Sequence, residues 1–124
     1  MAFDLVHYFA EQIEIQKPQI LQQHATEKRQ AHLFEINVLV LGKIISLWRT
    51  EPDQIYREIQ SQDQLYIQEI ARHLTTSLNN ESELSQTEFE QSSSEVLAFQ
   101  FQELKQLDNT GNYGQNGMRE LLLG

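Results

Sequence analysis

Cysteine is absent from this chain of 124 residues. Without thiols there is no disulfide framework and no thiolate metal site. The absence fits a reducing compartment. The N-terminus, "MAFDLVHYFAEQIEIQ", has no basic region and already carries an acid at Asp4, so we do not expect a signal peptide. We expect a cytoplasmic protein.

Basic residues are scarce, with 9 Lys and Arg against 18 Asp and Glu and a formal net charge of −9. Such a surface repels the phosphates of nucleic acids and anionic lipids. We expect no direct binding of nucleic acid, and any protein partner should be basic. The length and the 40% of hydrophobic residues suit one core, so residues 1–124 are expected to form a single domain.

A long uninterrupted hydrophobic run is also missing. The most apolar stretch, "HLFEINVLVLGKIISLWR" (residues 32–49), is interrupted by Glu35 and Lys43. A membrane span needs about 20 mostly apolar residues with few charges, so we expect no span here. A phosphate-binding loop would need glycine at Asn37 and Ser or Thr at Ile44, and has neither.

The periodicity of this stretch favours a helix over a strand. Glu35, Gly42, Ser46 and Arg49 fall on one narrow arc at about 100° per residue. Apolar side chains take the remaining two-thirds of the circumference, which is typical of a helix enclosed by its neighbours. The sequence therefore predicts a buried central helix.

The other segments also favour helices, giving an all-α, single-domain bundle of four to five helices. The alternative is an α+β fold, because "LAFQFQEL" alternates like a strand and could pair with part of "LFEINVLVL". At the C-terminus, "MRELLLG" suggests one helical turn, which is expected either to dock on the core or to belong to a longer chain. Further helices are expected over about 5–16 after an Asp4 cap, 19–31 running on into the central helix, 52–78, and 96–107.

Residues 79–95, "NNESELSQTEFEQSSSE", are polar, serine-rich and acidic, and are expected to form a mobile loop. No basic residue lies between Arg72 and Lys105. Clustered acids steer a positively charged partner toward its binding site, and two apolar side chains in the segment would serve as anchors. The predicted partner-binding residues are Glu81, Glu83, Leu84, Glu88, Phe89, Glu90 and Glu95.

The four histidines raise the question of a metal site. The chain has no Glu-x-x-His and no His-x-x-x-His motif, the patterns of the common metal sites in helical bundles. We therefore expect no metal and no cofactor. Asn37, Asp63 and His73 all fall on apolar helix faces, so they either form a buried polar cluster or bond locally.

These patterns favour a non-enzymatic protein-binding module, such as an inhibitor, an immunity-type protein or a regulatory accessory protein, that engages a basic partner through an acidic surface. One alternative is a metal-dependent helical-bundle enzyme in which His73, Glu69 and His7 converge. Another is a self-assembling structural protein, a homo-oligomer in which a second copy covers the leucines of "MRELLLG".

Overall fold

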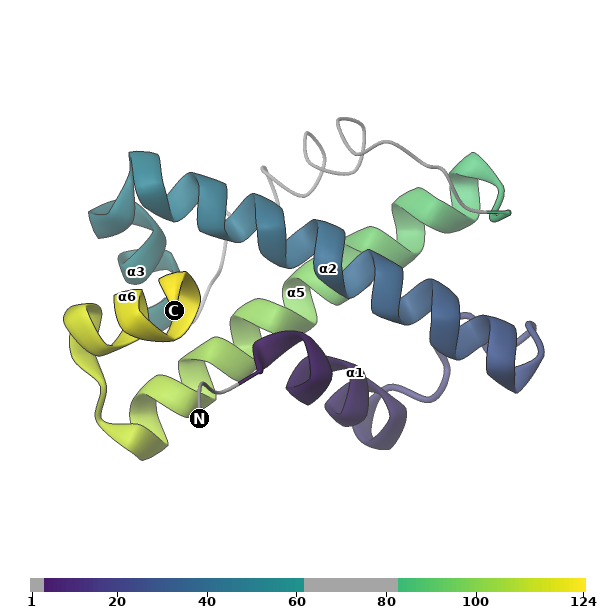
Figure 1. The fold of residues 1–124 in the computed structure, drawn as a ribbon, viewed down its shortest axis with the longest axis horizontal. Helices are drawn as coiled ribbons and strands as arrows, with labels where there is room; N and C mark the ends of the chain where they lie inside the picture. The colour runs from purple at the N-terminus through teal and green to yellow at the C-terminus, as the bar shows by residue number, and fades with distance from the viewer. Residues whose placement is uncertain (1–3, 62–82) are drawn as a thin grey trace.

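The computed structural model of the chain describes residues 4–61 and 83–124. Across these two ranges 82% of the residues are helical and none forms a strand. The predicted all-α class is confirmed, and the α+β alternative is wrong. The helices are α1 (Leu5–Gln16), α2 (Thr26–Thr50), α3 (Pro52–Gln60), α5 (Gln86–Gly111) and α6 (Gly114–Leu123) (Figure 1).

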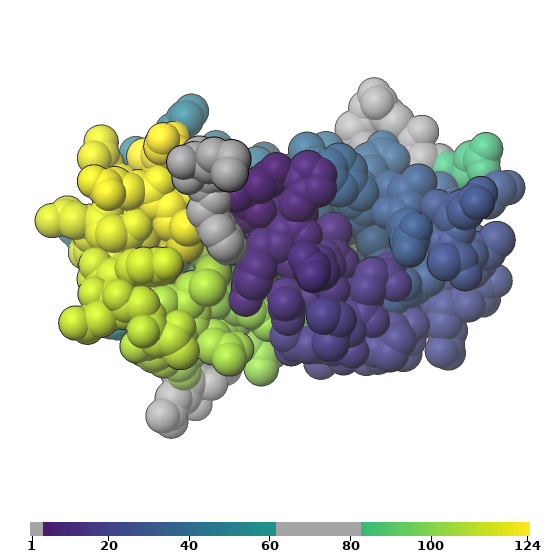
Figure 2. Space-filling model, turned by 60° about the horizontal axis from the view of Figure 1, so that its bottom comes forward, coloured from purple at the N-terminus to yellow at the C-terminus, as the bar shows by residue number. Residues whose placement is uncertain are grey.

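The two longest helices, α2 and α5, cross in the middle of the molecule (Figure 1). Near the crossing the side-chain amide of Gln100 in α5 donates a hydrogen bond to Asn37 Oδ1 in α2 at 2.9 Å. Helix α1 packs against both long helices and covers the middle of one face (Figure 2). Helices α3 and α6 pack together against one end of this pair.

Helix α2 contains the apolar run 32–49, as the periodicity predicts. Its enclosure is less complete than the sequence suggests, because Phe34 and Val38 stay 39% and 44% exposed. Helix α5 crosses α2 instead of running along it, so part of the apolar circumference of α2 remains uncovered (Figure 1). The apolar residues that α2 buries are Leu33, Ile36, Val40, Leu41, Ile44 and Trp48.

By length and composition alone, α2 could cross a membrane, since an 18-residue window within it has a mean hydropathy of 1.4. Within the described ranges it is the one helix that meets this test. The core helix of a soluble protein meets it as well, and 39% of this window is buried inside the molecule. The expectation that the run is not a membrane span stays a prediction.

Helix α1 begins where the sequence predicts. The Asp4 side chain accepts a hydrogen bond from the backbone N–H of His7 at 3.2 Å and so caps the first turn. One face of α1 is buried: Phe9 and Ile13 are fully enclosed, and Leu5 is 5% exposed. This face joins α1 to the core.

The predicted helix over 19–31 is confirmed for residues 26–31, which run on into the central helix, and is wrong for residues 19–25, because residues 17–25 form a series of turns and α2 begins only at Thr26. Leu21 adopts a φ of 55°, a left-handed conformation that a right-handed helix cannot contain. Ile20 and Leu21 are both buried and anchor this linker to the core.

Helix α3 starts at Pro52, as predicted, since the proline ring fixes the backbone angle that a first helical turn needs. Ile55 and Ile59 are both fully buried. The helix ends at Gln60. The remainder of the helix predicted to extend to about residue 78 lies outside the described residues.

The prediction of a loop over residues 79–95 is wrong for residues 86–95, which form the first turns of α5. The Ser85 hydroxyl caps this helix: it accepts from the backbone N–H of Glu88 at 3.2 Å and donates to the carboxylate of the same residue at 3.2 Å. The sequence "SQTE" matches the S-x-x-E pattern that marks a helix N-terminus, and its serine serves as the N-cap. The inner side of these turns buries Phe89, Ser92, Ser93 and Val96.

Residues 96–107, predicted as a separate helix, are the second half of α5. Asn112 then adopts a left-handed φ of 52°, and α6 follows directly. The leucines of "MRELLLG" belong to α6 instead of forming an isolated turn. Met118 and Leu122 are buried, so this segment docks on the core of its own chain.

Candidate functional site

Two of the predicted partner-binding residues cannot reach a partner. Leu84 and Phe89 are only 5% and 1% exposed and belong to the hydrophobic core. Their prediction as surface anchors is wrong, because the capped helix places Phe89 on its inner side. Glu81 lies outside the described residues.

The other four predicted carboxylates, Glu83, Glu88, Glu90 and Glu95, lie at the surface around the start of α5, and we call them the acidic surface. Glu83 and Glu95 are exposed, while Glu88 and Glu90 are half-buried. Lys28 Nζ lies 3.9 Å from Glu83 Oε2, but both side chains are largely exposed. Such a pair contributes little to stability and leaves the surface strongly negative.

A depression of about 130 Å³ lies between the linker and α5. Two carboxylates, three side-chain amides and a hydroxyl form its polar walls, and none of the described residues that line it is a lysine or an arginine. A positively charged side chain would complement these walls. The lining residues are Gln19, Leu21, Gln23, Glu88, Gln91, Ser92 and Glu95.

Glu88 has a structural role as well as a place in this depression. Its Oε2 atom lies 2.7 Å from His24 Nε2 and accepts a hydrogen bond from Gln23 Nε2 at 2.7 Å. These bonds, that of His24 first, hold the pKa of the Glu88 carboxyl below its usual value. The same carboxylate therefore accepts from the capping Ser85 hydroxyl and ties the linker to α5.

The structure describes only one member of the predicted polar cluster, Asn37. The other two, Asp63 and His73, lie outside the described residues. Asn37 is fully buried and donates to the backbone carbonyl of Leu33 at 2.8 Å. Its side-chain oxygen accepts from Gln100, a partner that sequence reasoning missed. The signal was available, since Gln100 stands between two apolar residues of the core-facing segment "AFQF".

The metal-site alternative involves His7, which is exposed and hydrogen-bonded through Nδ1 to Asp4. This bond lowers the pKa of the Asp4 carboxyl. No three His, Asp or Glu side chains come together to hold a metal ion anywhere in 4–61 or 83–124. Glu69 and His73 fall outside these ranges, so the metal-dependent enzyme stays a prediction.

Two carboxylates that the fold buries were also missed. Glu103 accepts hydrogen bonds from the Tyr8 hydroxyl at 3.0 Å and from Gln16 at 2.8 Å, which joins α1 to α5. Asp108 accepts from the Tyr56 hydroxyl at 3.0 Å, which joins α3 to α5. Burial raises the pKa of both tyrosine hydroxyls, and their carboxylate partners add to the shift. These contacts hold helices together.

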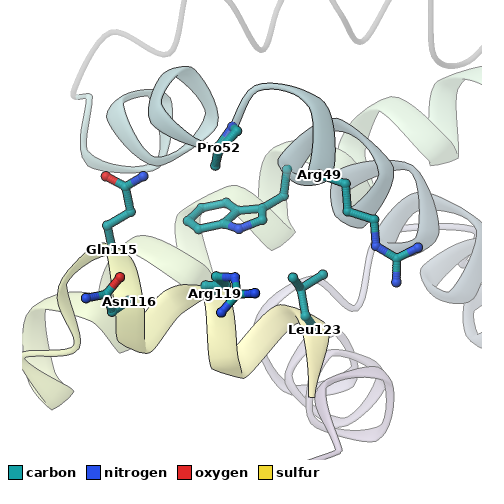
Figure 3. A pocket seen from close by; sticks show the side chains of 7 residues that line it. Arg49, Pro52, Gln115, Asn116, Arg119 and Leu123 are labelled. Atoms are coloured by element: carbon teal, nitrogen blue, oxygen red, sulfur yellow. The ribbon is translucent and has the colours of Figure 1, made fainter.

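A second hollow, of about 280 Å³, lies at the opposite end of the molecule from the acidic surface (Figures 1 and 3). It is formed where α2 ends, α3 begins and α6 packs against both. In contrast to the acidic depression, it carries two arginines and no described carboxylate. Its lining residues are Trp48, Arg49, Pro52, Gln115, Asn116, Arg119 and Leu123.

Comparison of the chain with protein families, with curated proteins and with solved structures gives no match. Functional evidence is thus confined to the residues of this chain and their geometry. Among the hollows of that geometry, two differ in the charge of their described lining residues: one lies beside the start of α5 and the other where α3 and α6 pack against the end of α2.

Proposed function

We propose that this protein is a non-enzymatic binding module that engages a basic protein partner through the acidic surface. The observation that carries the proposal is the depression between the linker and α5, where Glu88 and Glu95 face a polar hollow with no lysine or arginine among its described lining residues. A lysine or arginine side chain of the partner would enter this hollow and pair with the carboxylates.

The rigidity of the surface supports the proposal. The acidic surface is built on a capped helix, and the buried ring of Phe89 fixes its position. A preformed surface loses little conformational entropy when a partner binds, so more of the interaction energy appears as affinity. A flexible acidic loop would not have this advantage.

Electrostatics support it too. The acidic surface has one lysine within ion-pair distance among the described residues, Lys28, and the whole chain has a net charge of −9. Clustered charges of one sign accelerate the encounter with a partner of opposite charge and suppress binding to acidic competitors. Binding of this kind weakens as the ionic strength rises.

The test is a charge reversal with a matched control. In the test variant, Glu83, Glu90 and Glu95 are replaced by Lys; Glu88 is kept because its carboxylate joins the linker to α5 through Gln23 and His24. The control variant replaces three other exposed carboxylates by Lys and therefore has the same net charge. Its substitutions are Glu11→Lys, Glu35→Lys and Glu120→Lys.

Each protein is immobilised and exposed to an extract of its source cells, and captured proteins are identified by mass spectrometry. We expect the wild type and the control variant to retain one basic protein, and the test variant to lose it by at least about tenfold. Capture should also fall as salt is raised from low to physiological concentration. Retention of the partner by the test variant, or capture of acidic proteins only, would contradict the proposal.

A further inference from the structure

The hollow at the end of α2 contains a hydrogen-bond donor with no partner. Trp48 is 2% exposed, and its indole N–H is buried without a hydrogen bond to any described residue. Nearly all buried donors in folded proteins are paired, because an unpaired donor loses its hydrogen bond to water on folding and forms no new one. Trp48 lines the hollow, so an acceptor bound there could pair with the indole.

The same hollow concentrates positive charge in an otherwise acidic protein. Arg49 and Arg119 are two of only nine basic residues in the chain, and both line it. Neither forms an ion pair with a carboxylate in the described ranges. In Figure 3, Arg119 lies in the middle of the view, on α6, and Arg49 lies at the margin beyond Leu123.

The remaining walls set the size and character of a ligand. Pro52 and Leu123 are apolar and leave room beside the charged groups for a short hydrocarbon body. A volume of about 280 Å³ lies just below the range of about 300–1,000 Å³ that is usual for ligand pockets, which suits a small ligand. On one side, the side-chain amide of Gln115 donates to the Asp53 carboxylate at 2.7 Å, which ties α6 to α3.

We propose that this hollow binds a small organic carboxylate with an apolar body. Arg119 pairs with the carboxylate, since a guanidinium offers two parallel donors that match its two oxygens. The Trp48 indole N–H donates to the same ligand, and Arg49 adds positive charge at the margin. The apolar body of the ligand lies against Pro52 and Leu123. This site is independent of the proposed partner surface, which lies at the other end of the molecule.

The single tryptophan of the chain gives a direct readout. Purified protein at pH 7 is titrated with hexanoate while the emission of Trp48 is recorded. Hexan-1-ol, which has a comparable hydrocarbon body without the charge, and inorganic phosphate, which has the charge without the body, are titrated in parallel. We expect a saturable change with hexanoate and none with either comparison compound over the same concentration range.

Three variants then locate the site. Arg119→Gln should raise the Kd for hexanoate on the order of tenfold, because it removes a charge-assisted hydrogen bond. Arg49→Gln, at the margin, should raise it about two- to threefold. The control Arg57→Gln removes an exposed arginine of α3 that does not line the hollow, and should leave the Kd unchanged.

Each alternative outcome overturns a stated part of this proposal. Saturation by hexan-1-ol at the same concentrations would show an apolar site with no use for the carboxylate. Saturation by phosphate but not by hexanoate would show a site for inorganic anions. An unchanged Kd in Arg119→Gln would place binding elsewhere, provided that its unliganded emission spectrum matches the wild type and so reports an intact fold.

Discussion

Helix α2 carries an arginine near each end, and the two ends use it differently. Arg29 is 7% exposed, and its guanidinium donates to the backbone carbonyls of Ile20 at 2.7 Å and Lys17 at 3.2 Å and to the carboxylate of Glu14. Arg49 is exposed and forms no ion pair with any described carboxylate. Arg29 therefore stabilises the fold, whereas Arg49 can pair with a ligand.

The backbone next to each arginine explains the difference. The linker of residues 17–25 is irregular, so carbonyl groups that a helix would pair internally need another donor, and Arg29 provides it. At the other end α2 passes almost directly into α3, and the N–H of Glu51 bonds to the carbonyl of Leu47 within the terminal turn. The backbone there does not need the guanidinium of Arg49.

The largest effect should come from removing Arg29. Arg29→Met leaves two carbonyls without their donor and Glu14 without its cation, and should lower the free energy of unfolding by about 2–4 kcal/mol. Arg49→Met should change it by less than about 0.5 kcal/mol, because an exposed unpaired side chain is lost. Urea unfolding followed by Trp48 emission compares the two. Equal losses would show that Arg49 is also structural.

The sequence predicted the features that depend on local periodicity and local caps. The apolar pattern of 32–49 was enough to predict α2, Asp4 was enough to predict the start of α1, and Pro52 that of α3. The serine cap at Ser85 is an equally local signal that the prediction of a loop missed. The polar composition of residues 79–95 misleads because it describes the outer face of a helix as well as it describes a loop.

The sites could not be predicted in the same way, because their contacts join distant parts of the chain. His24 meets Glu88 across 64 positions, and Gln100 meets Asn37 across 63. No periodicity in one segment reveals which residue of another segment it will face. The hollow around Trp48 was missed for this reason, since its two arginines come from α2 and α6.

A smaller effect is expected at the crossing of α2 and α5, midway between the two arginines. Asn37→Leu removes the side-chain acceptor of the buried Gln100 amide, which keeps only the backbone carbonyl of residue 37 at 3.2 Å, and should cost about 1–3 kcal/mol. The double variant Asn37→Leu, Gln100→Met removes both polar groups and should recover part of that loss. A double-mutant cycle from urea unfolding measures the coupling. Simple additivity would show that this hydrogen bond does not stabilise the crossing.

The smallest effect concerns pH and is confined to the Arg29 end, where Glu88 ties the linker to α5. The folded-state pKa of Glu88 is depressed, mainly by the His24 hydrogen bond, so its contribution to stability is present above the unfolded pKa and is lost as pH falls through the folded value. Between about pH 5 and pH 3, around the usual glutamate pKa of about 4.3, the wild type should therefore lose stability more steeply than Glu88→Gln.

The measurement is the urea midpoint at several pH values, with Glu90→Gln as the control, because within the described residues the Glu90 carboxylate accepts from Gln86, one turn earlier on the same helix, and from no residue of the linker. At neutral pH, Glu88→Gln should be less stable than the wild type, and the two curves should converge as the carboxylate is protonated. Parallel curves for both variants and the wild type would mean that the His24–Glu88 contact does not hold the linker. The contrast between the two ends of α2 would then rest on Arg29 alone.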